Sequence, residues 1–175
     1  TAYEIASCLV GSEMCIRDSL TSNEVGFYQW IFDKHIIYIG GGNTAYMLEL
    51  WKNYNLINIF KNAYEKGIVL SGVSAGGVCW FDWILTDSLG SGYKPLKGIN
   101  LISGSCTPHS LEDNRMSQYQ SEIKKNKLPP GVAIDDGVAV LFVNGVAKEV
   151  CSTRENCDAY FVDKNNKISL KEYIK

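Results

Sequence analysis

Two short apolar runs, each ending in a glycine-rich turn before a helical pattern, constrain the fold of this chain most. The first, residues 35–44 (HIIYIGGGNT), predicts a buried strand that runs into a tight turn, with Asn43 or Thr44 capping the following helix. The second, residues 68–72 (IVLSG), follows a helical segment that Gly67 closes. Strands that alternate with helices pair in parallel through right-handed crossovers. The sequence therefore predicts an α/β fold with a mostly parallel sheet.

The rest of the chain first continues the alternation of strands and helices, and its C-terminal part then consists of consecutive short strands. Residues 75–83 read as a helix, residues 84–98 as a turn-rich loop and residues 99–103 as a short strand. A helix over residues 111–127, expected to be exposed, stops at two prolines. The tail consists of short strands separated by Gly or Asn turns: residues 132–137, 138–145, 146–151 and 159–163. Because the pattern holds no linker or repeat, residues 20–175 are predicted to form one domain.

Composition excludes several classes of function. The chain of 175 residues is long enough for a real core, and a formal net charge of −2 without a basic tract argues against nucleic acid. No apolar run approaches the roughly 20 residues of a membrane helix, and no export signal opens the sequence. The six cysteines are therefore expected to be reduced thiols in a cytoplasm. Their spacing lacks paired C-x-x-C units, so neither a metal nor a cofactor is expected.

The N-terminal stretch differs in character from the rest. Residues 9–19 (LVGSEMCIRDS) have no helical or strand period, and the run resembles the in-frame translation of a transposase adapter used in making DNA libraries. Residues 1–19 are therefore expected to be a non-native leader, with a genuine disordered leader as the alternative. The expected consequence is that N-terminal strands are missing, which would leave an exposed sheet edge and a poorly stable chain.

The segment that carries chemistry is residues 71–80 (SGVSAGGVCW). Gly72, Ser74 and Gly76 fit the pattern G-x-S-x-G between a strand and a helix, which is typical of a nucleophile elbow. Small neighbours permit the sharp turn, and a helix that starts after Ser74 aims backbone N–H groups at developing negative charge. Ser74 is therefore the candidate nucleophile. A tight packing turn is the alternative.

A serine nucleophile needs a base, and the chain has two histidines. His35 precedes the first strand, which places it roughly 13 Å from the C-terminal edge of the sheet at about 3.3 Å per residue. His109 follows a predicted strand, at the edge where open α/β sheets hold their sites. His109 is therefore the candidate base, and an ordinary loop histidine is the alternative.

The acid that would orient the imidazole stays open at this point. Asp82 is disfavoured because it lies eight residues into the predicted helix, about 12 Å from Ser74 along the axis. Chain spacing does not decide between Asp87, in a loop that could return to the site, and the adjacent pair Asp135 and Asp136. The full set of nearby carboxylates is Asp82, Asp87, Glu112, Asp113, Asp135 and Asp136.

The glycine-rich turn at residues 40–44 is expected at the same edge. Its backbone N–H groups could complete an oxyanion hole with the amide of Ala75. The alternative is a phosphate site at a helix N-terminus. That alternative lacks the lysine of a P-loop and the spacing of a dinucleotide fingerprint.

A resemblance to the peptidase E family of serine dipeptidases is carried by four stretches. They are residues 38–51 (YIGGGNTAYMLELW), 67–82 (GIVLSGVSAGGVCWFD), 86–88 (TDS) and 106–110 (CTPHS). The resemblance spans roughly residues 25–163. It implies a three-layer α/β/α fold similar to class I glutamine amidotransferases, in a family related to cyanophycinase.

The same resemblance assigns roles by matching this sequence to the family's motifs. It implies Ser74 as nucleophile, His109 as general base and Asp87 as the acid. Gly41, Gly42 and Ala75 match the oxyanion region. Asn43 and Arg115 are the implied substrate-binding residues, Arg115 being the only arginine in the segment LEDNRM that follows the histidine.

The sequence thus predicts a cytoplasmic serine peptidase that hydrolyses short peptides through a Ser-His-Asp triad and an acyl-enzyme, with its oligomeric state open. One alternative is an α/β-hydrolase esterase, which the short separation of Ser74 from His109 disfavours. Another is a non-catalytic binding domain of the same fold. Two weaker alternatives are a thiol nucleophile at Cys106 and an EF-hand at Asp163, where a hairpin turn over residues 164–167 is favoured.

Overall fold

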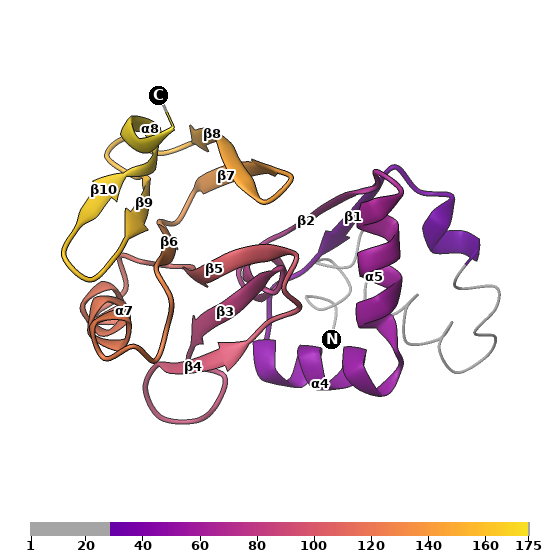
Figure 1. Ribbon diagram of the computed structural model, residues 1–175, viewed down its shortest axis with the longest axis horizontal. Coiled ribbons are helices and arrows are strands. Elements are labelled where there is room, and N and C mark those ends of the chain that lie inside the picture. Colours follow the sequence, from indigo (N-terminus) through magenta and orange to yellow (C-terminus); the bar gives the residue numbers. More distant parts are fainter. Residues whose placement is uncertain (1–28, 175) are drawn as a thin grey trace. The chain divides into compact units, whose positions relative to one another are not determined.

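The computed structural model describes residues 29–174 of the chain (Figure 1). These belong to two compact units that divide after Gly77, so the described part of the N-terminal unit is residues 29–77 and that of the C-terminal unit is residues 78–174. The expected non-native leader, residues 1–19, lies outside the described residues. Within residues 29–174, no helix is long and apolar enough to cross a membrane.

The N-terminal unit is built on two parallel strands joined by two helices. Strand β1 (Ile36–Ile39) pairs with β2 (Val69–Gly72) in a register that runs from Ile36 opposite Val69 to Ile39 opposite Gly72. Helices α4 (Thr44–Asn53) and α5 (Leu56–Glu65) form the connection. Parallel strands need such a crossover because a tight turn cannot join them. This confirms the strand–helix–strand order that the two glycine-ended runs predict.

The ends of these helices follow the sequence signals. Asn43 is the N-cap of α4, where its side-chain oxygen accepts a hydrogen bond from the backbone N–H of Tyr46 at 2.9 Å. Gly67 follows α5 with φ +82°, and its N–H donates to Tyr64 O at 2.9 Å. The core of the unit comes from one face of each helix: Leu48, Trp51, Leu56, Ile59, Phe60 and Ala63.

The C-terminal unit contains a six-stranded sheet in the order β10-β9-β6-β5-β3-β4. Strands β3, β5 and β6 are parallel neighbours at its centre, and the remaining pairings are antiparallel. The strand bounds are β3 Phe81–Thr86, β4 Lys94–Lys97, β5 Ile102–Thr107, β6 Gly131–Ile134, β9 Ala159–Val162 and β10 Lys167–Ser169. The predicted α/β fold with parallel central strands is confirmed. The loops after β3, β5 and β6 leave the sheet at one edge.

A helix and a hairpin complete the unit. Helix α7 (Arg115–Lys124) covers the sheet with Tyr119 and Ile123, both fully buried, so this helix is less exposed than its sequence predicts. The core cluster around it is Leu85, Tyr119, Ile123, Leu128, Ala133 and Val162. Strands β7 (Val138–Val143) and β8 (Val146–Ser152) pair as a separate hairpin. A short helix, α8 (Leu170–Tyr173), follows β10.

The helix predicted over residues 75–83 is wrong beyond its first turn. Helix α6 spans only Ala75–Val78, and β3 begins at Phe81. The run CWFDWILT is mostly apolar and interrupted by Asp82, so periodicity does not separate helix from strand, and its aromatic and β-branched side chains favour a strand. Asp82 therefore lies on β3. The predicted loop at 84–98 contains the end of β3 and all of β4, which pair as an antiparallel hairpin.

The turn between β9 and β10 is a hairpin, as the sequence favours. Asp163 N–H donates to Asn166 O at 3.0 Å, and the Asp163 carboxylate accepts the backbone N–H groups of Asn165 and Asn166 at 2.7 Å each. These hydrogen bonds to the ionised carboxylate lower the pKa of Asp163. The carboxylate is thus used within its own turn.

Candidate active site

The turn at Ser74 has the backbone of a nucleophile elbow. Ser74 lies between β2 and α6 with φ +52°, a left-handed conformation that is uncommon for a residue with a side chain. The turn is close-packed against β1: a Cβ on Gly76 would lie 2.2 Å from Ile39 O, and a Cβ on Gly72 would lie 2.3 Å from Gly76 O. Both glycines of G-x-S-x-G are therefore required by a close approach of backbone to backbone.

The glycine-rich turn after β1 lies beside the serine. A Cβ built on Gly41 would be 3.4 Å from Ser74 Cβ and 3.9 Å from Ser74 Oγ, so the two turns are in van der Waals contact. Gly42 has φ +147°, a region that side chains disfavour. Ala75 is buried at the start of α6. The N-terminal unit thus brings together the serine and the turn that the sequence analysis assigns to the oxyanion region.

Two other sequence assignments in this unit also have clear positions. Asn43 uses its side-chain oxygen to cap α4, which is a structural role at the place where a substrate-binding role was implied. His35 directly precedes β1, at the end of the strand opposite to the glycine-rich turn. This agrees with the expectation that His35 is not the base.

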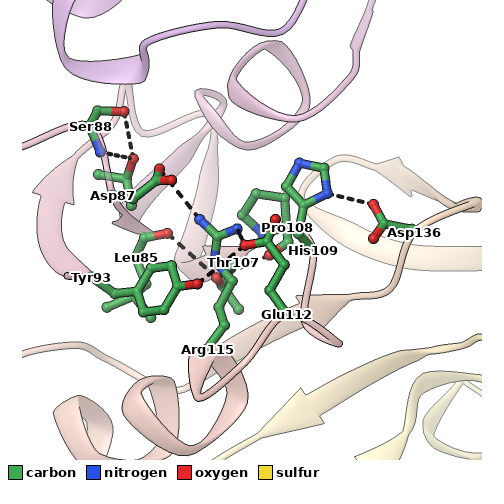
Figure 2. Close-up of polar contacts among 11 residues, drawn as sticks. Leu85, Asp87, Ser88, Tyr93, Thr107, Pro108, His109, Glu112, Arg115 and Asp136 are labelled. Atoms are coloured by element: carbon green, nitrogen blue, oxygen red, sulfur yellow. Dashed lines mark hydrogen bonds and ion pairs between the residues drawn. The ribbon is translucent and has the colours of Figure 1, made fainter. Parts of the chain in front are cut away.

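The C-terminal unit gives His109 a carboxylate partner. His109 follows β5 with φ +51°, and its Nδ1 lies 2.5 Å from Oδ1 of Asp136, which follows β6 (Figure 2). Both side chains are partly buried, with 31% and 39% exposed. A carboxylate oxygen accepts, so in the neutral imidazole this contact favours the tautomer with the proton on Nδ1 and the lone pair that a general base needs on Nε2.

The carboxylate that contacts His109 is not the one that the family resemblance implies as the acid. Asp87 follows β3 and its carboxylate points to Arg115, with 3.6 Å between Oδ1 and Nη2 (Figure 2). The carboxylate on the imidazole is Asp136, one of the pair that chain spacing left open. The physical reason is strand order: β5 and β6 are adjacent parallel strands, so the loops that leave their C-terminal ends emerge side by side.

Arg115, the implied substrate-binding arginine, is the centre of an internal ion-pair network. Only 3% of its side chain is exposed. Its Nη1 donates to Glu112 Oε2 at 2.6 Å, and its guanidinium lies over the Tyr93 ring at 4.5 Å. Tyr93 Oη also donates to Glu112 Oε2, at 3.2 Å. Glu112 and Asp87 together compensate the buried positive charge.

Sequence reasoning gave Ser110 no role, and it considered Glu112 and Asp135 only as candidate acids for the histidine, not in the contacts that they make here. The dipeptide HS at 109–110 follows β5 after one proline, and the dipeptide DD at 135–136 directly follows β6. Ser110 Oγ donates to Asp135 Oδ1, beside the contact of His109 with Asp136. Neither dipeptide by itself predicts that His109 and Ser110 contact Asp136 and Asp135.

The cysteines and other potential metal ligands of residues 29–174 form neither a metal site nor a disulfide. Among residues 29–174, no group of three or more His, Cys, Asp or Glu side chains could hold a metal ion. The four cysteines of this part are free thiols. Burial raises the pKa of the Cys106 thiol, which makes Cys106 a poor nucleophile.

Comparison with known proteins identifies the family. The profile of peptidase family S51 matches residues 19–150. The chain belongs to peptidase family S51. A relative in Bacillus subtilis (strain 168), named uncharacterized peptidase YgaJ, is 36% identical over 162 residues, which is 92% of this chain and 68% of the relative. Membership of S51 supports a peptidase function and agrees with the resemblance read from the sequence.

Proposed function

We propose that this S51 protein is a serine peptidase that hydrolyses short peptides, with Ser74 as nucleophile, His109 as general base and Asp136 as the acid that orients His109. The observation that carries the proposal is the contact of His109 Nδ1 with Asp136, which directs the lone pair to Nε2. The left-handed turn at Ser74 supports the role of nucleophile.

The proposed mechanism is acyl transfer. His109 Nε2 takes the proton of Ser74 Oγ as the oxygen attacks the scissile carbonyl carbon. Backbone N–H groups of Gly41, Gly42 and Ala75 would stabilise the oxyanion, each donor contributing on the order of 10²–10³ in rate. The imidazolium then gives its proton to the leaving amine. Water, deprotonated by the same imidazole, hydrolyses the acyl-enzyme and restores Ser74.

The Arg115 network bears on substrate preference. A guanidinium with two carboxylates on it carries little uncompensated charge. We therefore propose that a preference for an acidic substrate residue does not come from Arg115. The ratio of kcat/KM values for dipeptides with N-terminal Asp and with N-terminal Leu should then be the same in Arg115→Lys as in wild type. A change of that ratio above about tenfold would contradict this part of the proposal.

Labelling with a fluorophosphonate tests the nucleophile. Ser74→Ala should abolish labelling, and His109→Ala should reduce it by a factor of 10² or more, because the base activates the serine. Ser71→Ala is the matched control: this serine lies on β2 three residues before Ser74, where its Oγ donates to Ile37 O at 3.1 Å. Ser71→Ala should keep full labelling.

Each other outcome identifies a different function. A folded chain that takes no label would refute catalysis through Ser74 and indicate a binding role. Labelling that depends on Ser74, with turnover of aryl esters but not of peptides, would indicate an esterase. Peptide profiling with the labelled enzyme would then test the predicted restriction to short peptides.

A further inference from the structure

Two consecutive residues after β5 meet two consecutive residues after β6. His109 contacts Asp136, and the next residue, Ser110, donates its hydroxyl hydrogen to Asp135 Oδ1. The backbone joins the loops as well, since Ser110 N–H donates to Ile134 O at 3.1 Å. The two loops are therefore connected by a pair of side-chain contacts and a main-chain hydrogen bond next to the proposed base.

The two side-chain contacts differ in burial. Ser110 and Asp135 are only 4% and 3% exposed, whereas His109 and Asp136 are 31% and 39% exposed. A buried carboxylate destabilises the fold unless hydrogen bonds satisfy its oxygens. One oxygen of Asp135 accepts from Ser110, and the other accepts from the Asp158 N–H at 2.9 Å. Ser110 and Asp135 thus form a buried pair in which both carboxylate oxygens accept a hydrogen bond. The neighbouring pair, His109 and Asp136, is partly exposed.

Asp158 connects the pair of Ser110 and Asp135 to the C-terminal end of the chain. Asp135 N–H donates to Asp158 O at 3.1 Å, so the two aspartates are joined in both directions. The carboxylate of Asp158 in turn accepts from Ser169 Oγ at 2.7 Å and lies 3.7 Å from Lys171 Nζ. Asp135 is therefore fixed by Ser110 and by Asp158, the residue before β9, which Ser169 of β10 and Lys171 of α8 contact in turn.

We propose that Ser110 and Asp135 are positioning residues that hold His109 against Asp136. His109 has a left-handed backbone, which persists in a residue with a side chain only where neighbours hold it. The carbonyl oxygen of His109 accepts from Glu112 N–H at 3.0 Å, and the hydroxyl of the next residue, anchored on a buried carboxylate, is a second such constraint. The inference rests on the proposed function, because its consequence for catalysis requires His109 to be the base.

The test compares Ser110→Ala with Ser105→Ala. Ser105 is a matched control on β5: it is fully buried, and its Oγ lies 2.6 Å from Tyr119 Oη and 2.5 Å from Pro129 O. Both variants lose a buried hydroxyl from the same strand or the loop after it. We expect both to melt below wild type. Only Ser110→Ala should lose kcat, by about tenfold to a hundredfold, since small misplacements of a catalytic group have effects of that size.

Two readouts separate positioning from simple stability. KM should stay within about twofold while kcat falls, because the substrate-binding surface is intact. In wild type, the Nδ1–H proton of His109 should give a low-field NMR resonance, assigned with His35→Gln. That resonance should remain in Ser105→Ala and broaden or disappear in Ser110→Ala, measured well below both melting temperatures.

A second variant keeps the inference testable if Ser110→Ala does not fold. In Asp135→Asn the amide oxygen can still accept from Ser110, but the amide nitrogen then meets the N–H of Asp158. We expect this variant to lose kcat relative to Ser105→Ala, with the resonance weakened, and a kcat equal to that of Ser105→Ala with the resonance unchanged would contradict the inference. Equal activity of Ser110→Ala and Ser105→Ala at matched stability would overturn the inference. Failure of the proposed function looks different: wild type itself would be inactive while the resonance is present.

Discussion

Replacing Gly76 by alanine tests whether the turn at Ser74 depends on contact between backbones. The new Cβ would lie 2.2 Å from Ile39 O and 2.6 Å from Gly40 O. Ordinary contact begins at 3.4 Å, so the strand and the turn would have to separate by about 1.2 Å. Both partners are main-chain atoms of β1 and its turn, so no side chain can rotate away.

The expected magnitude follows from two opposing effects. Overpacking of a close-packed site costs about 1–3 kcal/mol, and a clash between backbones lies at the upper end of that range. Alanine recovers up to about 1 kcal/mol of helix propensity relative to glycine. The net loss is about 2 kcal/mol, which corresponds to a fall in Tm of roughly 4–8 °C for a chain of this size. A displacement near 1 Å at Ser74 should also lower kcat/KM by about a factor of 10².

The assay is a thermal melt followed by circular dichroism, together with peptidase activity at 20 °C or about 20 °C below Tm. Gly40→Ala is the matched control, because a Cβ at Gly40 meets no described heavy atom within 4 Å. This control should melt within about 2 °C of wild type. If the Tm of Gly76→Ala equals that of wild type, or if Gly40→Ala loses as much stability, the turn does not depend on the close approach of Gly76 to the backbone of Ile39 and Gly40.

Three further predictions concern the C-terminal unit. Asp136→Asn should lower kcat on the order of 10³–10⁴-fold by giving His109 the wrong tautomer, while Asp87→Asn should lower it less than about tenfold, and equal losses would restore Asp87 as the acid. Leu85→Ala should destabilise the fold by about 2–5 kcal/mol in a denaturant titration, because Leu85 is fully buried in the core cluster; a loss below about 1 kcal/mol would contradict that packing. In native protein, iodoacetamide should modify the exposed Cys151 and spare Cys106, whose burial raises its thiol pKa, and peptide mapping that finds Cys106 modified would contradict this burial.

Much of the fold was predictable because its signals are local. The strand at 36–39, the glycine-rich turn and the cap at Asn43 each depend on a few consecutive residues. The tail strands were also predicted correctly, since Gly and Asn turns separate them. The error at residues 79–86 arose where an apolar run satisfied both helix and strand patterns. The conformation of that run is decided by its parallel pairing with β5, in which Phe81 lies opposite Ile102. The partner strand thus comes from much further along the chain.

The sequence by itself determined the candidate nucleophile and base. A serine flanked by glycines and a histidine that follows a strand are local signals, which can be read without knowing what they contact. It also determined the family, through the motifs that carry the resemblance. Only the tertiary structure decided which carboxylate meets His109 and that a buried pair, Ser110 and Asp135, lies beside that contact. The reason is that such contacts depend on strand order: β5 and β6 are adjacent in the sheet, but 23 residues separate Thr107 from Gly131, and chain spacing does not encode adjacency.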